Sequence, residues 1–209
     1  MCIRDRSKSL GNVVDPLQLR EEFGTDALRW YLLREMPTGQ DASYTPERFL
    51  TRYEELANVL GNLASRVLSM TVKYRDGVIP DAPGTGLDEA IAGTLSRVEA
   101  SLASFRIHDA LGAAMDLARD ANGYVETREP WAQAKDPARA GELDETLATL
   151  ARALTLLAAL FQPVCPEKME ELAGRLGLDG IPTLADARAV SLSGRAVAKG
   201  DPLFPRKDR

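Results

Sequence analysis

A short polar segment near the start of the chain carries the residue types best suited to chemistry. Ser7, Lys8 and Ser9 stand shortly before Asp15 and Pro16, which signal the start of a helix. Two hydroxyl groups beside a lysine can bind the oxygens of a triphosphate, while the ammonium group stabilises the charge that develops as pyrophosphate leaves. The same tripeptide also fits an ordinary solvent-exposed terminus, so taken alone it predicts little.

A second set of candidates lies further along the chain. Asn62 and Arg66 are four residues apart on one face of a predicted helix, roughly 90° to 135° from the middle of its apolar stripe. They should therefore face outward, toward solvent or into a groove. Such a pair is also common on ordinary surfaces. Trp131 follows Pro130 in a polar connection between helices. Its indole either packs at one end of a helix bundle or is available to a binding partner.

The composition excludes several other kinds of site. His108 is the single histidine, so a histidine-based triad or a His-rich metal site within this chain is ruled out. The two cysteines, Cys2 and Cys165, are too few for a disulfide framework or a four-cysteine zinc site, and favour a reducing, cytoplasmic location. The net charge of -5 argues against a strongly basic nucleic-acid binder. No apolar run approaches the roughly 20 residues of a membrane span.

The elements that must position these residues are predicted to be helices. With 44% hydrophobic and 6% aromatic residues, the 209-residue chain favours packed helices over a β-sandwich. Apolar spacing and capping residues predict helices over about 17–23, 25–36, 45–74, 87–104, 107–124, 143–161 and 166–177. We therefore expect an all-α chain with a helical joining module at 7–40, an antiparallel helix bundle at 45–178 and an irregular tail at 179–209.

Two longer runs carry a resemblance to a known family. Residues 7–16 are Ser-Lys-Ser-Leu-Gly-Asn-Val-Val-Asp-Pro, and residues 23–35 are Phe-Gly-Thr-Asp-Ala-Leu-Arg-Trp-Tyr-Leu-Leu-Arg-Glu. Together they resemble the end of the catalytic core of class I aminoacyl-tRNA synthetases. Residues 39–41, Gly-Gln-Asp, and residues 62–66, Asn-Leu-Ala-Ser-Arg, narrow the resemblance to the methionyl-tRNA synthetases. The likeness extends from Ser7 into the tail.

The chain differs from the family near its N-terminal end. The signature loop of the family is Lys-Met-Ser-Lys-Ser, whereas this chain has Asp-Arg-Ser-Lys-Ser at residues 5–9. Residues 1–6 therefore look like a non-native leader. Lys8 matches the second lysine of the loop, which implies that it binds ATP and stabilises the transition state of amino-acid adenylation, with Ser7 and Ser9 shaping the loop. The nucleotide-binding half that precedes this loop in the family is missing, so we expect these residues alone to be inactive.

The resemblance also implies a function and partners. The parent protein would be an ATP-dependent methionine-tRNA ligase that forms methionyl-adenylate and passes methionine to tRNA(Met), with Mg2+ accompanying ATP and no metal ligand among these residues. Asn62, Arg66 and Trp131 match the family's residues for recognising the CAU anticodon, Trp131 by stacking on a base. No DNA or membrane partner is expected. Two alternatives stay open, a catalytically inactive tRNA-binding module and a helical interaction domain without an RNA role.

Overall fold

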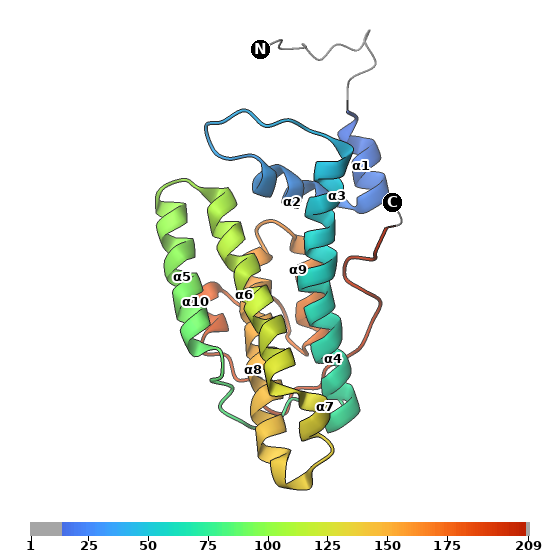
Figure 1. Cartoon of the computed structure of the whole chain (residues 1–209), viewed down its shortest axis with the longest axis vertical. Helices are drawn as coiled ribbons and strands as arrows, with labels where there is room; N and C mark the ends of the chain where they lie inside the picture. Colours follow the sequence, from blue (N-terminus) through green and yellow to red (C-terminus); the bar gives the residue numbers. More distant parts are fainter. Residues whose placement is uncertain (1–13, 208–209) are drawn as a thin grey trace.

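Helices form almost all the regular structure in a computed structural model of the chain, which describes residues 14–207 (Figure 1). Its longer α-helices are α1 (Pro16–Phe23), α2 (Thr25–Glu35), α3 (Pro46–Glu55), α4 (Asn62–Arg75), α5 (Asp88–Ala103), α6 (Ile107–Arg128), α8 (Ala140–Phe161) and α9 (Pro166–Arg175). Between residues 14 and 207 there is no β-strand, only an isolated bridge from Val78 to Ala196. The predicted all-α fold is confirmed. Within the same residues, no helix combines the length and apolar character needed to cross a membrane.

The first two helices begin and end where local chemistry favours it. The Asp15 carboxylate accepts a hydrogen bond from the Leu17 backbone N–H at 2.8 Å, and Pro16 occupies the first turn of α1. Gly24 ends α1 with a φ of 88°, a conformation that glycine adopts at little cost. Gly24 also holds the capping position of α2, which begins at Thr25.

One continuous rod follows and carries two of the candidate residues. It consists of α3, the π-helical segment η2 (Leu56–Gly61) and α4. The Thr45 hydroxyl caps its start by accepting from the Arg48 backbone N–H at 3.2 Å, and Asp76, with a φ of 52°, ends it. The extent predicted for this helix is confirmed, but its centre is π-helical. Because a π turn takes up an extra residue, it rotates every side chain that follows it relative to a regular α-helix.

The core lies between this rod, α6 and α8, which run lengthwise through the molecule, with α5 packed on the outside of α6 (Figure 1). Large apolar side chains of α8 are almost completely buried, namely Leu143, Leu147, Leu150, Leu154, Leu157 and Phe161. The facing side of α6 is built largely from alanine, which lets the helices approach closely: Ala113, Ala114, Ala118 and Ala121 are all buried. Since consecutive helices alternate in direction, α4 and α6, separated by α5, run parallel to each other.

The tail after α9 is irregular, as predicted, but it is packed against the bundle. Leu203 and Phe204 are 0% and 4% exposed, and the Tyr53 hydroxyl donates to the Pro205 carbonyl at 2.6 Å. Phe204 also lies against Gly61 of the rod. The tail includes the short helix α10 (Leu184–Ala187), which the sequence analysis missed. These contacts make the tail part of the folded core.

Gly86 provides a test of how tightly the loop before α5 is packed. Its N–H donates to the Thr149 hydroxyl at 3.2 Å, and a methyl group on its Cα would overlap the Tyr124 phenol. We expect Gly86→Ala to lower the free energy of unfolding by about 1–2 kcal/mol, because the rigid ring must shift. Gly93→Ala is the matched control, since a Cβ there meets nothing within 4 Å; it should raise stability by about 0.5–1 kcal/mol. Urea unfolding measures both, and effects of the same sign would contradict this account.

Candidate functional site

Asn62 and Arg66 face α6 from the first two turns of α4. The Asn62 amide donates to the Asn122 side-chain oxygen at 3.5 Å, and an Arg66 guanidinium nitrogen lies 2.6 Å from a carboxylate oxygen of Glu126. Both candidates are half-buried, with 28% of the Arg66 side chain exposed, so they lie at the edge of the seam between two helices. This position agrees with the prediction that they lie off the apolar stripe and face a groove or solvent.

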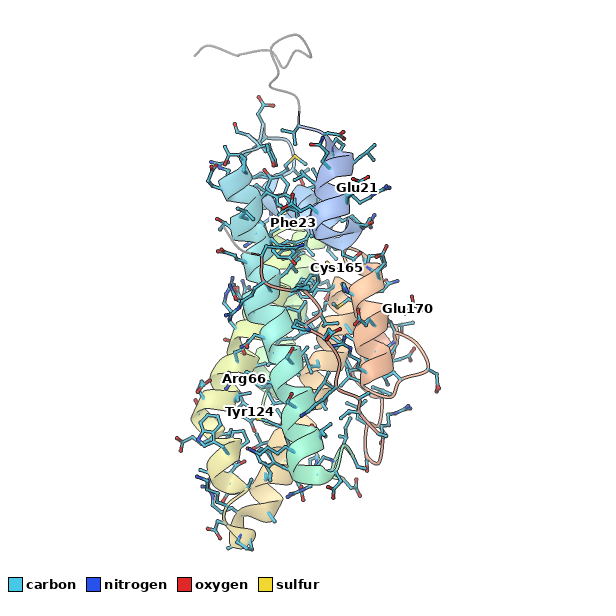
Figure 2. The ribbon with its side chains drawn as sticks, turned by 90° about the vertical axis from the view of Figure 1, so that its right-hand side faces the viewer. Glu21, Phe23, Arg66, Tyr124, Cys165 and Glu170 are labelled. Atoms are coloured by element: carbon cyan, nitrogen blue, oxygen red, sulfur yellow. The ribbon has the colours of Figure 1, made fainter. Side chains whose placement is uncertain are left out.

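The parallel course of α4 and α6 explains why these four side chains meet in pairs. Asn62 and Arg66 are four residues apart on one helix, and Asn122 and Glu126 are four residues apart on the other. Residues at this spacing share a face, and two parallel helices advance at the same rate per residue. The contact of Asn62 with Asn122 therefore places Arg66 opposite Glu126. Figure 2 shows Arg66 on the surface where these helices run alongside each other.

Trp131 lies just beyond the end of α6. Glu129, with a φ of 48°, breaks that helix, and Pro130 starts the four-residue helix α7 (Pro130–Gln133). The indole is 38% exposed, whereas Gln133, two residues later, is buried. The sequence left open whether this indole closes one end of the bundle or is available to a partner. Its exposure favours the second position. Figure 1 places α7 at the same end of the bundle as the C-terminal half of α4.

The loop formed by Ser7, Lys8 and Ser9 lies outside the described residues, so its predicted role stays a prediction. Across residues 14–207, no group of three or more His, Cys, Asp or Glu side chains is arranged to hold a metal ion. Cys165, the residue before α9, is fully buried, and burial raises the pKa of its thiol.

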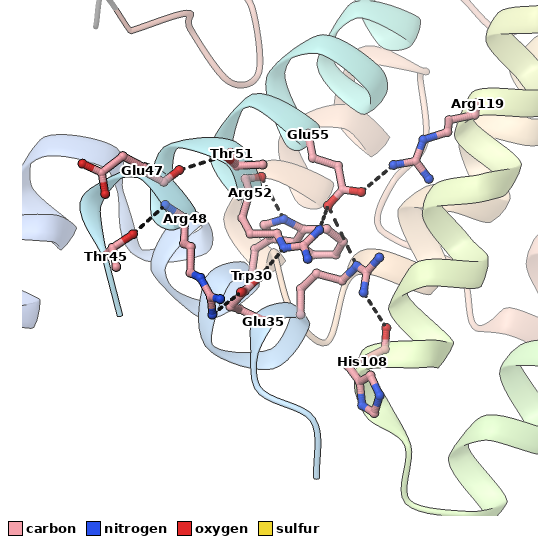
Figure 3. A network of polar contacts seen from close by, with 11 residues as sticks. Trp30, Glu35, Thr45, Glu47, Arg48, Thr51, Arg52, Glu55, His108 and Arg119 are labelled. Carbon is pink, nitrogen blue, oxygen red and sulfur yellow. Dashed lines mark hydrogen bonds and ion pairs between the residues drawn. The ribbon is translucent and has the colours of Figure 1, made fainter. Parts of the chain in front are cut away.

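A partly buried network of charged residues, centred on Glu55, lies about two to three turns before Asn62 and was not predicted (Figure 3). At its centre the Glu55 side chain, 9% exposed, contacts Arg52 at 3.3 Å and also pairs with Arg119 of α6. Arg34 of α2 lies 3.9 Å from the same carboxylate and donates to the His108 carbonyl at 3.3 Å. Burial lowers the pKa of the Arg34 guanidinium. The network thus joins α2, the rod and α6 immediately above the candidate site.

Sequence reasoning also missed the α6 side of the site. Asn122 and Glu126 are polar residues at i,i+4 spacing, the same signal that singled out Asn62 and Arg66. The predicted helix over 107–124 stops before Glu126, whereas α6 continues to Arg128. A helix that continues to Arg128 places Asn122 and Glu126 on one face. The sequence still does not indicate that they contact Asn62 and Arg66.

Comparison with known proteins shows which class of proteins this architecture is similar to. A family model described as "tRNA synthetases class I (M)" matches residues 4–68. The methionine-tRNA ligase of Halalkalibacterium halodurans is 38% identical over 212 aligned residues, 97% of this chain and 32% of the relative. That of Bacillus subtilis is 39% identical over 210 residues, 96% of this chain and 32% of the relative. The structure of Mycobacterium tuberculosis methionyl-tRNA synthetase in complex with methionyl-adenylate superposes with a TM-score of 0.88 at 38% identity, covering 96% of this chain and 41% of that one.

The chain is thus homologous to class I aminoacyl-tRNA synthetases. Within that class, the methionyl-tRNA synthetases are similar to it along almost its whole length. The resemblance drawn from residues 7–16, 23–35 and 62–66 is confirmed. The chain spans about a third of the length of the curated relatives it matches.

Proposed function

We propose that this chain is the anticodon-recognition part of a methionine-tRNA ligase, which as a whole charges tRNA(Met) with methionine through methionyl-adenylate. Similarity to methionine-tRNA ligases over 97% of the chain supports the class of enzyme. The observation that carries the anticodon role is the placement of Asn62 and Arg66 along one half-exposed seam, with an exposed Trp131 at the adjacent end of α6.

The chemistry of the three side chains suits unstacked bases. An amide offers both a donor and an acceptor, and a guanidinium offers several donors in one plane, so Asn62 and Arg66 can bond base edges. An indole that is 38% exposed offers a flat face for base stacking. The ion pair between Arg66 and Glu126 holds the guanidinium at the surface, and because Glu126 is 62% exposed, solvent screens that pair and RNA can compete with it. Local chemistry thus allows RNA binding in a chain with a net charge of -5.

At the reaction centre we propose that Lys8, flanked by Ser7 and Ser9, binds ATP and offsets the negative charge that develops as pyrophosphate leaves. Mg2+ would accompany ATP, and the proposal assigns it no ligand in this chain. Methionine, ATP and tRNA(Met) with the anticodon CAU are the proposed partners of the whole protein, and the proposed location is the cytoplasm. The support for this part is the similarity to methionine-tRNA ligases and the Ser-Lys-Ser sequence itself.

The experiment that tests the anticodon role is a titration of the 209-residue chain with tRNA. A tRNA bearing CAU is compared, at one stated salt concentration, with the same tRNA carrying a single changed anticodon base. We expect CAU to bind more tightly, and Trp131→Ala to weaken CAU binding by about 5- to 150-fold, which corresponds to the roughly 1–3 kcal/mol of one stacked base.

A matched aromatic control is available at the opposite end of the bundle. Phe105 is 76% exposed in the α5–α6 connection, so Phe105→Ala should leave both tRNA affinities unchanged. Equal binding of the two tRNAs by a folded sample, or equal effects of the two substitutions, would contradict the anticodon role. A folded chain that binds neither tRNA would instead favour a helical interaction domain.

A further inference from the structure

We infer that Asn122 is a positioning residue: it determines which hydrogen-bonding atom of Asn62 faces the RNA. The inference deepens the proposed anticodon role of Asn62 and rests on it. Asn122 lies on α6, is itself half-buried, and contacts Asn62 across the seam between the two helices.

Backbone carbonyls fix the orientation of the Asn122 amide. Its nitrogen donates to the Ala118 carbonyl at 2.9 Å, one turn back on α6, and to the Val59 carbonyl at 3.1 Å on the rod. A side-chain amide nitrogen carries two hydrogens, and these two bonds use both. A flipped amide would place its oxygen against two carbonyl oxygens, so only this orientation is satisfied. The Asn122 oxygen is therefore held toward Asn62.

The π-helical segment explains why Val59 is available to a side chain of another helix. Val59 lies in η2, where the backbone departs from the regular i to i+4 bonding of the rod. The Val59 carbonyl accepts from the Asn62 backbone N–H and, with its second lone pair, from the Asn122 amide. The same Asn122 side chain also contacts the side chain of Asn62, the first residue of α4.

The fixed orientation of the Asn122 amide determines the orientation of the Asn62 amide. A carbonyl oxygen can only accept, so Asn62 must present its NH2 group to Asn122, as it does at 3.5 Å. Because the amide is planar, its own oxygen is then turned away from Asn122. Asn62 consequently offers an acceptor to a bound base. An acceptor pairs with an exocyclic amino group, as in cytosine or adenine, and repels the carbonyl oxygen that replaces it in uracil or guanine.

A double-mutant cycle on the 209-residue chain tests this inference. Asn62→Ala, Asn122→Ala and the double variant are titrated with tRNA bearing CAU, and with tRNAs bearing UAU or CGU, in which one amino group becomes a carbonyl. We expect Asn122→Ala to reduce the preference for CAU over one of these changed anticodons by about tenfold, nearly as much as Asn62→Ala. The double variant should show no further loss of preference, because Asn122 acts only through Asn62.

Asn58→Ala serves as the matched control, since Asn58 is an exposed asparagine one turn before Asn62 on the same rod, and it should leave the preference unchanged. Circular dichroism establishes that each variant is folded. If Asn122→Ala does not fold, Asn122→Ser takes its place, because a hydroxyl can bond the Ala118 carbonyl but is too short to reach Asn62.

The outcomes separate the inference from the proposed function. Additive losses in the double variant, or an unchanged preference in Asn122→Ala while Asn62→Ala loses it, would overturn the positioning role of Asn122. An unchanged preference in Asn62→Ala would instead remove Asn62 from the proposed anticodon site, and the positioning role with it. Non-additive loss confined to one changed anticodon supports the inference and shows which base Asn62 contacts.

Discussion

Glu55→Ala is expected to lower the free energy of unfolding by about 2–3 kcal/mol, because it removes the carboxylate shared by a partly buried cluster of arginines. The Glu55 carboxylate pairs with Arg119, lies 3.3 Å from Arg52 and 3.9 Å from Arg34, and only 9% of the side chain is exposed (Figure 3). Without it, Arg52 keeps its pair with Glu35 at 2.7 Å and Arg119 keeps its pair with Asp116 at 2.8 Å, whereas the mostly buried Arg34 loses the carboxylate beside it. Urea unfolding at neutral pH measures the loss.

Two further variants separate charge from shape at this position. Glu55→Gln keeps the size and one acceptor oxygen but removes the negative charge, so it should recover only a minor part of the lost stability. Glu99→Ala removes an exposed carboxylate from α5 and should change stability by less than about 0.5 kcal/mol. A Glu55→Ala variant as stable as Glu99→Ala would show that the pairs with Glu35 and Asp116 compensate the arginines without Glu55.

The helices were predictable because their signals are local. Thr45 and Asp15 cap the helices that they were expected to start, and the spacing of Leu143, Leu147 and Leu150 alone predicts the buried face of α8. The π-helical η2 was not predictable in this way, since an apolar stripe continues through it and the extra residue shows only in backbone bonding.

At the candidate site, the sequence singles out residues but not their contacts. Asn62, Arg66 and Trp131 are candidates by type, spacing and family resemblance, and their role stays a prediction. The partners Asn122 and Glu126 depend on the register between α4 and α6, which is set by packing across some 60 residues of sequence. The network around Glu55 was not predictable for the same reason, because only the contact of Glu55 with Arg52 is local in sequence. The other predicted site, Ser7, Lys8 and Ser9, lies outside the described residues and stays a prediction.

The packing of α2 indicates whether the predicted joining helices unfold separately from the bundle or together with it. Trp30 of α2 is completely buried, its ring centre lies 5.5 Å from that of Phe161 on α8, and its indole N–H donates to the Arg52 carbonyl at 3.0 Å. Ala27 and Tyr31 belong to the same apolar core as the bundle helices. A segment joined to the bundle by one core should unfold together with it.

Trp30→Ala is therefore expected to lower the free energy of unfolding by about 3–5 kcal/mol, since it leaves a cavity among α2, α3 and α8. Trp30→Phe should cost less, because it retains most of the apolar contact and loses mainly the bond to the Arg52 carbonyl, worth roughly 1–3 kcal/mol when its partner is left unsatisfied. Leu32→Ala, on an exposed position of the same helix, is the control and should cost under about 1 kcal/mol. Urea unfolding followed by far-UV circular dichroism should give one transition that moves to lower urea in both Trp30 variants. If Trp30→Ala moved only a minor early phase, α2 would unfold apart from the bundle, and the core would have to be drawn as two separate units.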